Sequence, residues 1–131
     1  MNYTYFMLPL SILKGTERGV DEEGNFILAK DKKVYRLHVV GSVAALELNE
    51  ESGSGYVVID DTFSTVLAHF QKPLFNLFND IVRGSLVEAI GSIDVYNEST
   101  TLYLNNIKKI SLDRYCYNKL ESIKNLKAIV V

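Results

Sequence analysis

Hydrophobic and polar residues alternate over much of the chain between residues 34 and 110, and alternation over short runs is typical of half-buried β-strands. The runs rich in β-branched and aromatic residues predict five strands, over residues 34–48, 56–60, 65–70, 86–96 and 102–110. Leu37, Val39 and Val43 are the expected core positions of the first strand. In the second strand, Val57 and Ile59 are expected to point to one side and their neighbours to the other.

Two of these strands carry a glycine in their interior, at Gly41 and Gly91. A strand tolerates an interior glycine mainly where it bulges or bends, and a small closed barrel needs such bends. A long strand with a glycine, a hairpin, a short helical segment, a second strand with a glycine and a final strand follow in the order of the five-stranded OB barrel. The sequence therefore predicts an all-β fold with accessory helices, one between the third and fourth barrel strands and one at the C-terminus.

The accessory segments have their own patterns. Apolar residues at 74, 75, 77, 78, 81 and 82 follow Pro73 and predict a short helix that closes one end of the barrel. Asp113 is expected to cap the C-terminal helix. Residues 15–24 are polar and rich in glycine, which predicts a surface loop. The resulting division is an N-terminal apolar segment and loop packed on the barrel (1–25), an OB-fold domain (26–112), and a C-terminal helix with an apolar tail (113–131).

Length and charge limit the function. The chain has 131 residues, enough for one barrel-sized core. Its 14 basic and 16 acidic residues give a net charge of −2, which argues against a protein that coats duplex DNA by charge alone. Any nucleic-acid site must therefore be a local patch.

No composition feature indicates a cofactor, a metal site or a membrane span. Cys116 is the single cysteine, so neither an internal disulfide nor a cysteine-based zinc site is expected, and the protein is predicted to be intracellular. The apolar stretch 3–13 is too short to span a bilayer and contains Pro9.

Catalysis is not expected either. Asp60 and Asp61 are adjacent, so their side chains point to opposite faces and fit turn capping better than metal binding. His38 and His69 lack a credible nucleophile, and no phosphate-binding glycine loop is present. These patterns predict a protein without catalytic or metal-binding residues.

Three segments resemble the OB-fold domain of the middle subunit of replication protein A and its archaeal single-stranded DNA-binding relatives. They are Val-Val-Gly-Ser-Val at 39–43, Tyr-Val-Val-Ile-Asp-Asp at 56–61, and Val-Glu-Ala-Ile-Gly-Ser-Ile-Asp-Val-Tyr at 87–96 followed by Thr-Leu-Tyr-Leu-Asn-Asn-Ile at 101–107. The resemblance covers roughly residues 26–126 and includes the placement of the C-terminal helix.

The resemblance implies a site for single-stranded DNA in which bases stack on aromatic residues near the end of the third strand and on the last hairpin. These positions correspond to Phe70 and Tyr96, with Tyr103 as a further candidate. If alternation holds along the third strand, Phe70 faces the core and the outward position belongs to His69 or Gln71. Arg36 and Lys72 are the leading candidates for phosphate contacts, whereas Glu98 makes the hairpin loop acidic, so binding is expected to be weak.

The resemblance also implies that the C-terminal helix joins helices of other OB-fold subunits, through Cys116, Leu120 and Ile123. The alternative is that the helix folds back on its own barrel. The leading hypothesis is a non-enzymatic single-stranded DNA-binding subunit of a replication protein A-like complex in replication, recombination or repair. An OB-fold protein-interaction scaffold of a genome-maintenance complex, with weak or no nucleic-acid binding, is the first alternative, and an RNA-binding OB module of translation is another.

Overall fold

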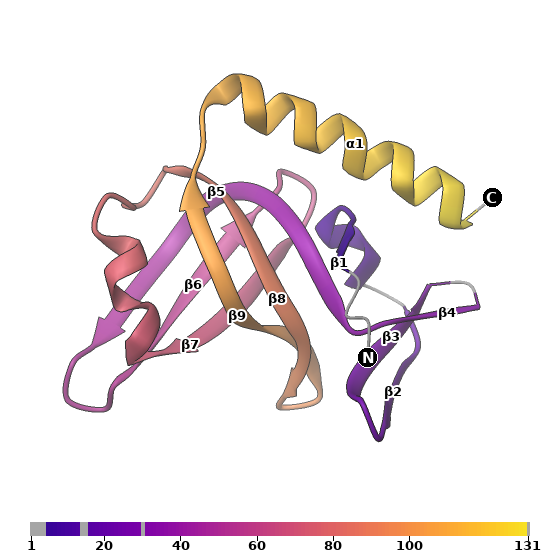
Figure 1. Cartoon of the computed structure of the whole chain (residues 1–131), viewed down its shortest axis with the longest axis horizontal. Coiled ribbons are helices and arrows are strands. Elements are labelled where there is room, and N and C mark those ends of the chain that lie inside the picture. Colours follow the sequence, from indigo (N-terminus) through magenta and orange to yellow (C-terminus); the bar gives the residue numbers. More distant parts are fainter. Residues whose placement is uncertain (1–4, 14–15, 30, 131) are drawn as a thin grey trace.

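Five strands close into a barrel in the computed structural model of the chain, which describes residues 5–13, 16–29 and 31–130 (Figure 1). Within this described part, the barrel strands are β5 (Arg36–Asn49), β6 (Ser54–Asp60), β7 (Thr65–Gln71), β8 (Leu86–Tyr96) and β9 (Ser99–Lys109). β5 pairs antiparallel with β6 and with β8, while β7 and β9 meet in a short parallel pairing that completes the closure. The predicted five-stranded barrel is confirmed, with helical segments between β7 and β8 and after β9.

The two interior glycines lie near the irregularities of the barrel. The register of β8 against β9 shifts between Ile90 and Gly91, as predicted. On β5 the shift falls between Val43 and Ala45, just beyond Gly41. At Gly41 itself a Cβ atom would lie 2.6 Å from the carbonyl oxygen of Asp60, so this position allows β5 and β6 to approach closely.

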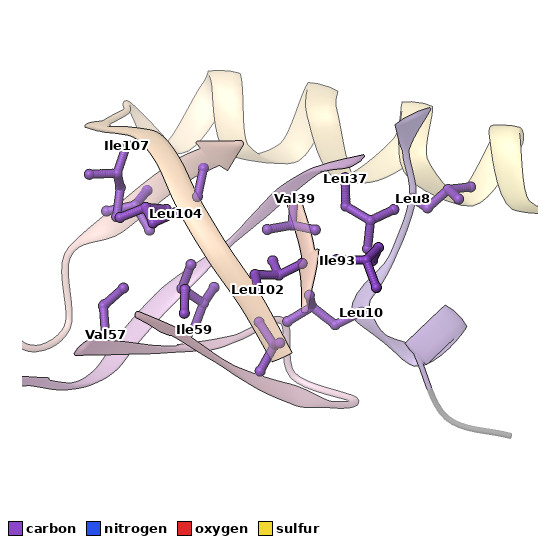
Figure 2. Close-up of a cluster of buried hydrophobic side chains, with 14 of the residues drawn as sticks. Leu8, Leu10, Leu37, Val39, Val57, Ile59, Ile93, Leu102, Leu104 and Ile107 are labelled. Atoms are coloured by element: carbon purple, nitrogen blue, oxygen red, sulfur yellow. The ribbon is translucent and has the colours of Figure 1, made fainter. Parts of the chain in front are cut away.

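Alternate side chains of the barrel strands fill its interior, as the alternation predicted. Leu37, Val39, Val43, Val57 and Ile59 are all buried. Figure 2 shows a cluster of buried side chains, in which residues of β5, β6, β8 and β9 meet those of the N-terminal segment. The labelled members are Leu8, Leu10, Leu37, Val39, Val57, Ile59, Ile93, Leu102, Leu104 and Ile107.

The described part of the N-terminal segment completes this core. β1 (Tyr5–Met7) pairs in parallel with the start of β5, and the 3-10 helix η1 (Leu10–Leu13) follows. The side chains of Leu8 and Leu10 are almost wholly buried. The described part of this segment therefore belongs to the hydrophobic core.

A second sheet forms before the barrel, where part of the sequence predicted a surface loop. β2 (Arg18–Asp21), β3 (Gly24–Ala29) and β4 (Lys32–Val34) pair in an antiparallel, three-stranded arrangement. The prediction of a loop over 15–24 is wrong for residues 18–21, because the missing side chain of Gly19 leaves room for the ring of Phe26 across the strand pair. The domain boundary predicted at residue 26 falls inside β3.

A hydrogen bond joins this sheet to the start of the barrel. The hydroxyl of Tyr35 donates to the carboxylate of Asp21 at 2.7 Å. The bond lowers the pKa of Asp21 to about 2, with further help from Lys33, and raises the pKa of Tyr35 to about 12. Each group thus keeps the protonation state that the bond requires over a wide pH range.

The predicted helix after Pro73 forms as a 3-10 helix, η2 (Lys72–Phe78). Its apolar residues recur at intervals of three, as at Phe75 and Phe78, and side chains three apart line up on a 3-10 helix. Phe78 and the following Ile81 are buried, whereas Val82 is exposed.

The C-terminal helix α1 (Leu112–Val130) lies across the outside of the barrel (Figure 1). Its N-cap is Ser111, whose hydroxyl accepts a hydrogen bond from the backbone N–H of Arg114 at 3.2 Å. The prediction of Asp113 as the cap is therefore wrong, because the helix begins at Leu112 and its cap lies two residues earlier, at Ser111. Asp113 lies in the first turn, where a carboxylate interacts favourably with the helix dipole.

Candidate nucleic-acid interface

A row of cross-strand neighbours connects three of the six predicted binding residues. The register places Tyr56 opposite His69, His69 beside Tyr103, Tyr103 opposite Ser92, and Ser92 opposite Arg36. Directly paired residues project from the same face of a sheet, and the buried residues of these strands lie on the opposite face. Three residues that are far apart in sequence, Arg36, His69 and Tyr103, therefore share one outward-facing belt.

His69 is the centre of this belt. Its Nε2 lies 2.8 Å from a carboxylate oxygen of Asp94 on β8. Its ring meets the ring of Tyr103 edge to face, with 5.2 Å between centroids. The imidazole of His69 is therefore held between the ring of Tyr103 and the carboxylate of Asp94.

A groove of about 560 Å³ opens beside His69. The end of β5, the β5–β6 loop, β6, β7 and the tip of the β8–β9 hairpin form its walls. Tyr96 comes from the hairpin and is 65% exposed, so its ring is available to a ligand. The lining residues are Glu47, Asn49, Ser52, Ser54, Gly55, Tyr56, Leu67, His69, Phe70, Gln71 and Tyr96.

Tyr56 is a groove residue that the sequence reasoning did not select. Its hydroxyl bonds to the carboxylate of Glu47, and this bond together with the negative charge raises the pKa of Tyr56. The alternation over residues 56–60 could have identified Tyr56. Because Val57 and Ile59 are the expected core positions, Tyr56 is expected on the outward side of the strand. An aromatic residue on that outward side faces the groove.

Phe70 was predicted as a stacking residue, and the structure contradicts this. Its side chain is wholly buried and stacks on Phe78 of η2, with 4.5 Å between centroids. Phe75 meets it edge to face. The alternation along β7 turns Phe70 inward and His69 outward, which is the arrangement expected if the period of two is maintained. Phe70 therefore forms the floor beneath the groove, and no base can stack on it.

The two predicted cations, Arg36 and Lys72, are not among the residues that line the groove. Lys72 follows β7, where its Nζ lies 3.7 Å from a carboxylate oxygen of Glu50. Arg36 lies at the far end of the belt, on the first residue of β5. The lining residues themselves include one carboxylate, Glu47, and no lysine or arginine. The groove is thus aromatic and mildly acidic.

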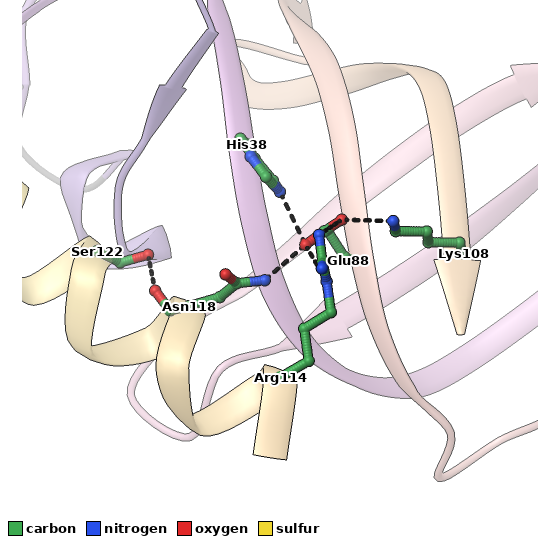
Figure 3. A network of polar contacts seen from close by, with 6 residues as sticks. All are labelled: His38, Glu88, Lys108, Arg114, Asn118 and Ser122. Atoms are coloured by element: carbon green, nitrogen blue, oxygen red, sulfur yellow. Dashed lines mark hydrogen bonds and ion pairs between the residues drawn. The ribbon is translucent and has the colours of Figure 1, made fainter. Parts of the chain in front are cut away.

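The helix α1 presents a polar side to the barrel. Asn118 and Ser122 are the most buried of the helix residues whose burial is described, and Asn118 donates a side-chain hydrogen bond to Glu88 of β8. Arg114 makes two further hydrogen bonds to the same carboxylate, each of 3.2 Å. Figure 3 shows these contacts, with His38 and Lys108 approaching Glu88 from β5 and β9 at 3.3 Å each.

The opposite side of α1 faces solvent and carries apolar residues among charged ones such as Lys124 and Lys127. The predicted partner residues Cys116, Leu120 and Ile123 are all exposed there, Leu120 by 69%. Leu112 and Tyr117 are exposed as well and were missed, although Leu112 continues the spacing of 116, 120 and 123. These residues depart from the usual amphipathic pattern, in which the apolar side of a surface helix faces the core. Leu126, near the other end of the helix, follows that pattern and packs against the core.

The described residues show no constellation for metal chemistry. No group of three or more histidine, cysteine, aspartate or glutamate residues is close enough to hold a metal ion within the described ranges. Asp60 and Asp61 accept hydrogen bonds from backbone N–H groups of Thr62, Phe63 and Ser64, which confirms the prediction of turn capping. Among the described helices, none combines the length and the apolar character that a bilayer crossing requires.

Solved structures resemble this chain closely in shape and distantly in sequence. A chain of a replication protein A heterotrimer bound to ssDNA superposes with a TM-score of 0.80 at 11% identity, covering 98% of this chain and 99% of that one. A chain of the S. pombe Stn1–Ten1 complex gives 0.80 at 13% identity, covering 97% and 94%. A chain of yeast RPA bound to ssDNA gives 0.69 at 14% identity, covering 93% and 89%.

Sequence comparisons add nothing to this, since no protein-family model and no curated protein matches the chain. Identities of this size establish shape only. The chain nevertheless matches chains of these complexes over nearly its whole length, helix α1 included. The protein therefore has the OB fold, and the resemblance to replication protein A-type OB subunits seen in its sequence is supported by its structure.

Proposed function

We propose that the protein is a non-enzymatic OB-fold subunit of a multi-subunit complex that binds single-stranded DNA in replication, recombination, repair or telomere maintenance. The observation that carries the proposal is the row of exposed apolar residues on α1. Polar residues of the helix are fixed to Glu88 by hydrogen bonds, and these apolar residues are left in solvent. Burial of exposed apolar area in an interface stabilises assembly.

The role of α1 is assembly with other OB-fold subunits. Cys116, Leu120 and Ile123 lie on one line along the solvent side of the helix, where a partner helix can cover them. The alternative that the helix only folds back on its own barrel explains Asn118 and Ser122 but leaves these apolar residues without a function. One helix can make both the contact with its own barrel and the contact with a partner, because the two contacts use opposite sides of the helix.

The role of the groove is weak contact with DNA bases. Tyr96 offers the most exposed ring of the groove, and His69 and Tyr103 offer a second aromatic pair on the adjoining belt. Stacking on aromatic rings contributes about 1–3 kcal/mol per base and tolerates any sequence. Arg36 and Lys72 are the proposed phosphate contacts. The carboxylates of Glu47 and Asp94 oppose phosphates, so the affinity of the isolated chain is expected to be low.

Fluorescence anisotropy of a labelled single-stranded DNA oligomer tests the groove. We expect salt-sensitive binding to the purified chain, and a loss of several-fold on Tyr96→Ala. Tyr117→Ala is the matched control, because Tyr117 is 64% exposed but lies on α1. Equal affinities for the wild type and Tyr96→Ala would remove Tyr96 from the site.

Native assembly is tested separately. The tagged chain, purified from its source cells, is expected in a complex much heavier than its own 14.8 kDa in mass photometry. The double variant Leu120→Glu/Ile123→Glu should purify as a folded monomer, while Val20→Ser, at an exposed apolar position of the small sheet, should not change the mass. A wild-type chain that purifies as a monomer would contradict the proposal.

The mildly acidic groove favours a second candidate function. An OB-fold scaffold that binds proteins, with little affinity for nucleic acid, needs no basic residues in the groove. Assembly through α1 without measurable DNA binding would identify this function. Competition by a matched RNA oligomer, equal to or stronger than that by DNA, would instead indicate an RNA-binding module.

A further inference from the structure

The turn between β6 and β7 holds a backbone conformation that its sequence disfavours. Thr62 has a φ of 88°, a left-handed conformation that is rare for a β-branched residue. Hydrogen bonds on each side of it fix the turn. The N–H of Thr62 donates to Asp60 at 2.8 Å, and the N–H groups of Phe63 and Ser64 donate to Asp61 at 3.1 and 2.9 Å.

The same turn is tied to two other parts of the molecule. The second carboxylate oxygen of Asp61 accepts the backbone N–H of Leu10 at 2.8 Å, which connects the turn to the N-terminal segment. The backbone carbonyl of Asp61 accepts a hydrogen bond from Lys119 of α1 at 3.0 Å. The turn therefore has a fixed position beside the helix.

This rigid turn presents Phe63 to solvent. Its side chain is 74% exposed, although it is large and apolar. The ammonium of Lys119 lies 5.3 Å from the centre of its ring, and Phe63 and Ile123 together line a small cleft of about 30 Å³ between the turn and α1. The strained backbone at Thr62 does not improve packing of the core, because it holds Phe63 outward. Strained backbone conformations are most common at functional sites.

We propose that Phe63, with Ile123 and Lys119, forms an anchor for an amphipathic helix of a different subunit, and that this helix carries acidic residues along its polar edge. The inference rests on the proposed function of α1 and adds the β6–β7 turn to that interface. The partner packs an apolar side chain against Phe63 and Ile123. Aromatic residues beside a cleft are typical centres of binding energy.

Charge complementarity sets the chemistry of the partner. Residues 119–127 of α1 contain Lys119, Lys124 and Lys127 against a single glutamate, Glu121. Within the described residues none of these lysines makes an ion pair with a carboxylate, so their charges are available to a partner. A second copy of this chain running parallel would set the same lysines against each other, which disfavours that occupant.

Two synthetic helical peptides of three heptads each provide the probe, both with leucine at the a and d positions. One has glutamate and the other lysine at the e and g positions. Titrated into the full chain and followed by calorimetry, the glutamate peptide is expected to bind roughly tenfold more tightly than the lysine peptide. Phe63→Ala should weaken it about fivefold or more, whereas Val20→Ala, also at a highly exposed apolar position, should not.

The variant Lys124→Glu/Lys127→Glu should reverse the preference between the two peptides. Binding that is lost in Leu120→Glu but unchanged in Phe63→Ala would overturn the anchor and leave the proposed α1 interface standing. Failure of both peptides to bind would overturn the inference, as would a homodimer in light scattering that Phe63→Ala dissociates. None of these results depends on DNA binding by the groove or on the mass of the native complex, so the proposed function is tested independently.

Discussion

Glu88 on β8 accepts a hydrogen bond from the side-chain amide of Asn118, thirty residues further along the chain on α1. Both residues are buried, so their hydrogen bond is largely shielded from water. Arg114, Lys108 and His38 surround the same carboxylate (Figure 3). One acidic side chain therefore connects three strands of the barrel to the helix.

Replacement of Glu88 by glutamine should destabilise the fold. The variant keeps the shape of the side chain but removes the charge that balances Arg114 and Lys108, both half exposed. We expect a loss of about 1–3 kcal/mol in the free energy of unfolding, measured by urea denaturation. Glu51→Gln, at an exposed position, is the control and should change stability by less than about 0.5 kcal/mol. Equal stabilities of Glu88→Gln and wild type would show that the cluster does not hold the helix.

Stability should also depend on pH through Glu88. Burial raises its pKa, but the hydrogen bond from Arg114, with the nearby His38 and Lys108, outweighs burial and lowers the pKa below the ordinary value of 4.5. The unfolded chain then binds more protons at acidic pH, so this contribution is complete above about pH 4.5 and is lost as the pH falls through the folded-state pKa.

Urea midpoints measured between pH 7 and pH 3 test this dependence. The wild type should lose stability on acidification more steeply than Glu88→Gln, so that the two curves converge at low pH. Parallel curves over the whole range would show that Glu88 titrates normally in the folded protein.

The barrel was predictable from the sequence because its signals are local and periodic. Alternation in β6 placed Val57 and Ile59 in the core, and the boundaries of β8 agree with the predicted ones. The small sheet was not predictable in the same way, since β2 contains one exposed valine, Val20, and depends on Phe26 from the next strand for its packing. Its stability comes from contacts between strands rather than from the pattern within one.

The candidate site was predictable only in part, because it depends on which strands become neighbours. Tyr96 lies on a hairpin tip, where a local pattern suffices. The belt of Arg36, His69 and Tyr103 arises from the register between strands that are distant in sequence, and Tyr56 joins it through the same register. The family correspondence points to Phe70 as a stacking residue, but the alternation along β7 turns its side chain into the core.

Gly41 should not tolerate a side chain. A Cβ atom at this position would lie 2.6 Å from both the carbonyl oxygen of Asp60 and the side chain of Ile59, and neither can move without opening the pairing of β5 with β6. Gly41→Ala is therefore expected to cost about 1–3 kcal/mol in thermal or urea unfolding. Ser42→Ala, one residue further and half-buried, is the control and should have a small effect. Wild-type stability in Gly41→Ala would indicate that the strands are more loosely paired.

The charge of the groove should limit its affinity for DNA. Asp94 lies 2.8 Å from His69, so its carboxylate is the negative charge closest to the centre of the belt. Asp94→Asn retains a hydrogen-bonding side chain and removes the charge. A unit charge about 7 Å from a phosphate, largely in water, contributes somewhat less than 1 kcal/mol. The variant should therefore bind single-stranded DNA about two- to fivefold more tightly than wild type at low salt, as measured by anisotropy.

Two comparisons distinguish this local effect on DNA affinity from an effect of the net charge. One raises the ionic strength, and the other makes the same charge change at a different position. Screening shortens the range of the field to about 8 Å at physiological ionic strength, so the gain from Asp94→Asn should shrink there. Glu22→Gln makes the same change of net charge on an exposed turn of the small sheet, away from the groove residues, and should leave the affinity nearly unchanged. An equal gain in both variants would mean that DNA senses only the overall charge. A gain confined to Asp94→Asn would place the DNA beside His69, where the aromatic belt and the groove meet.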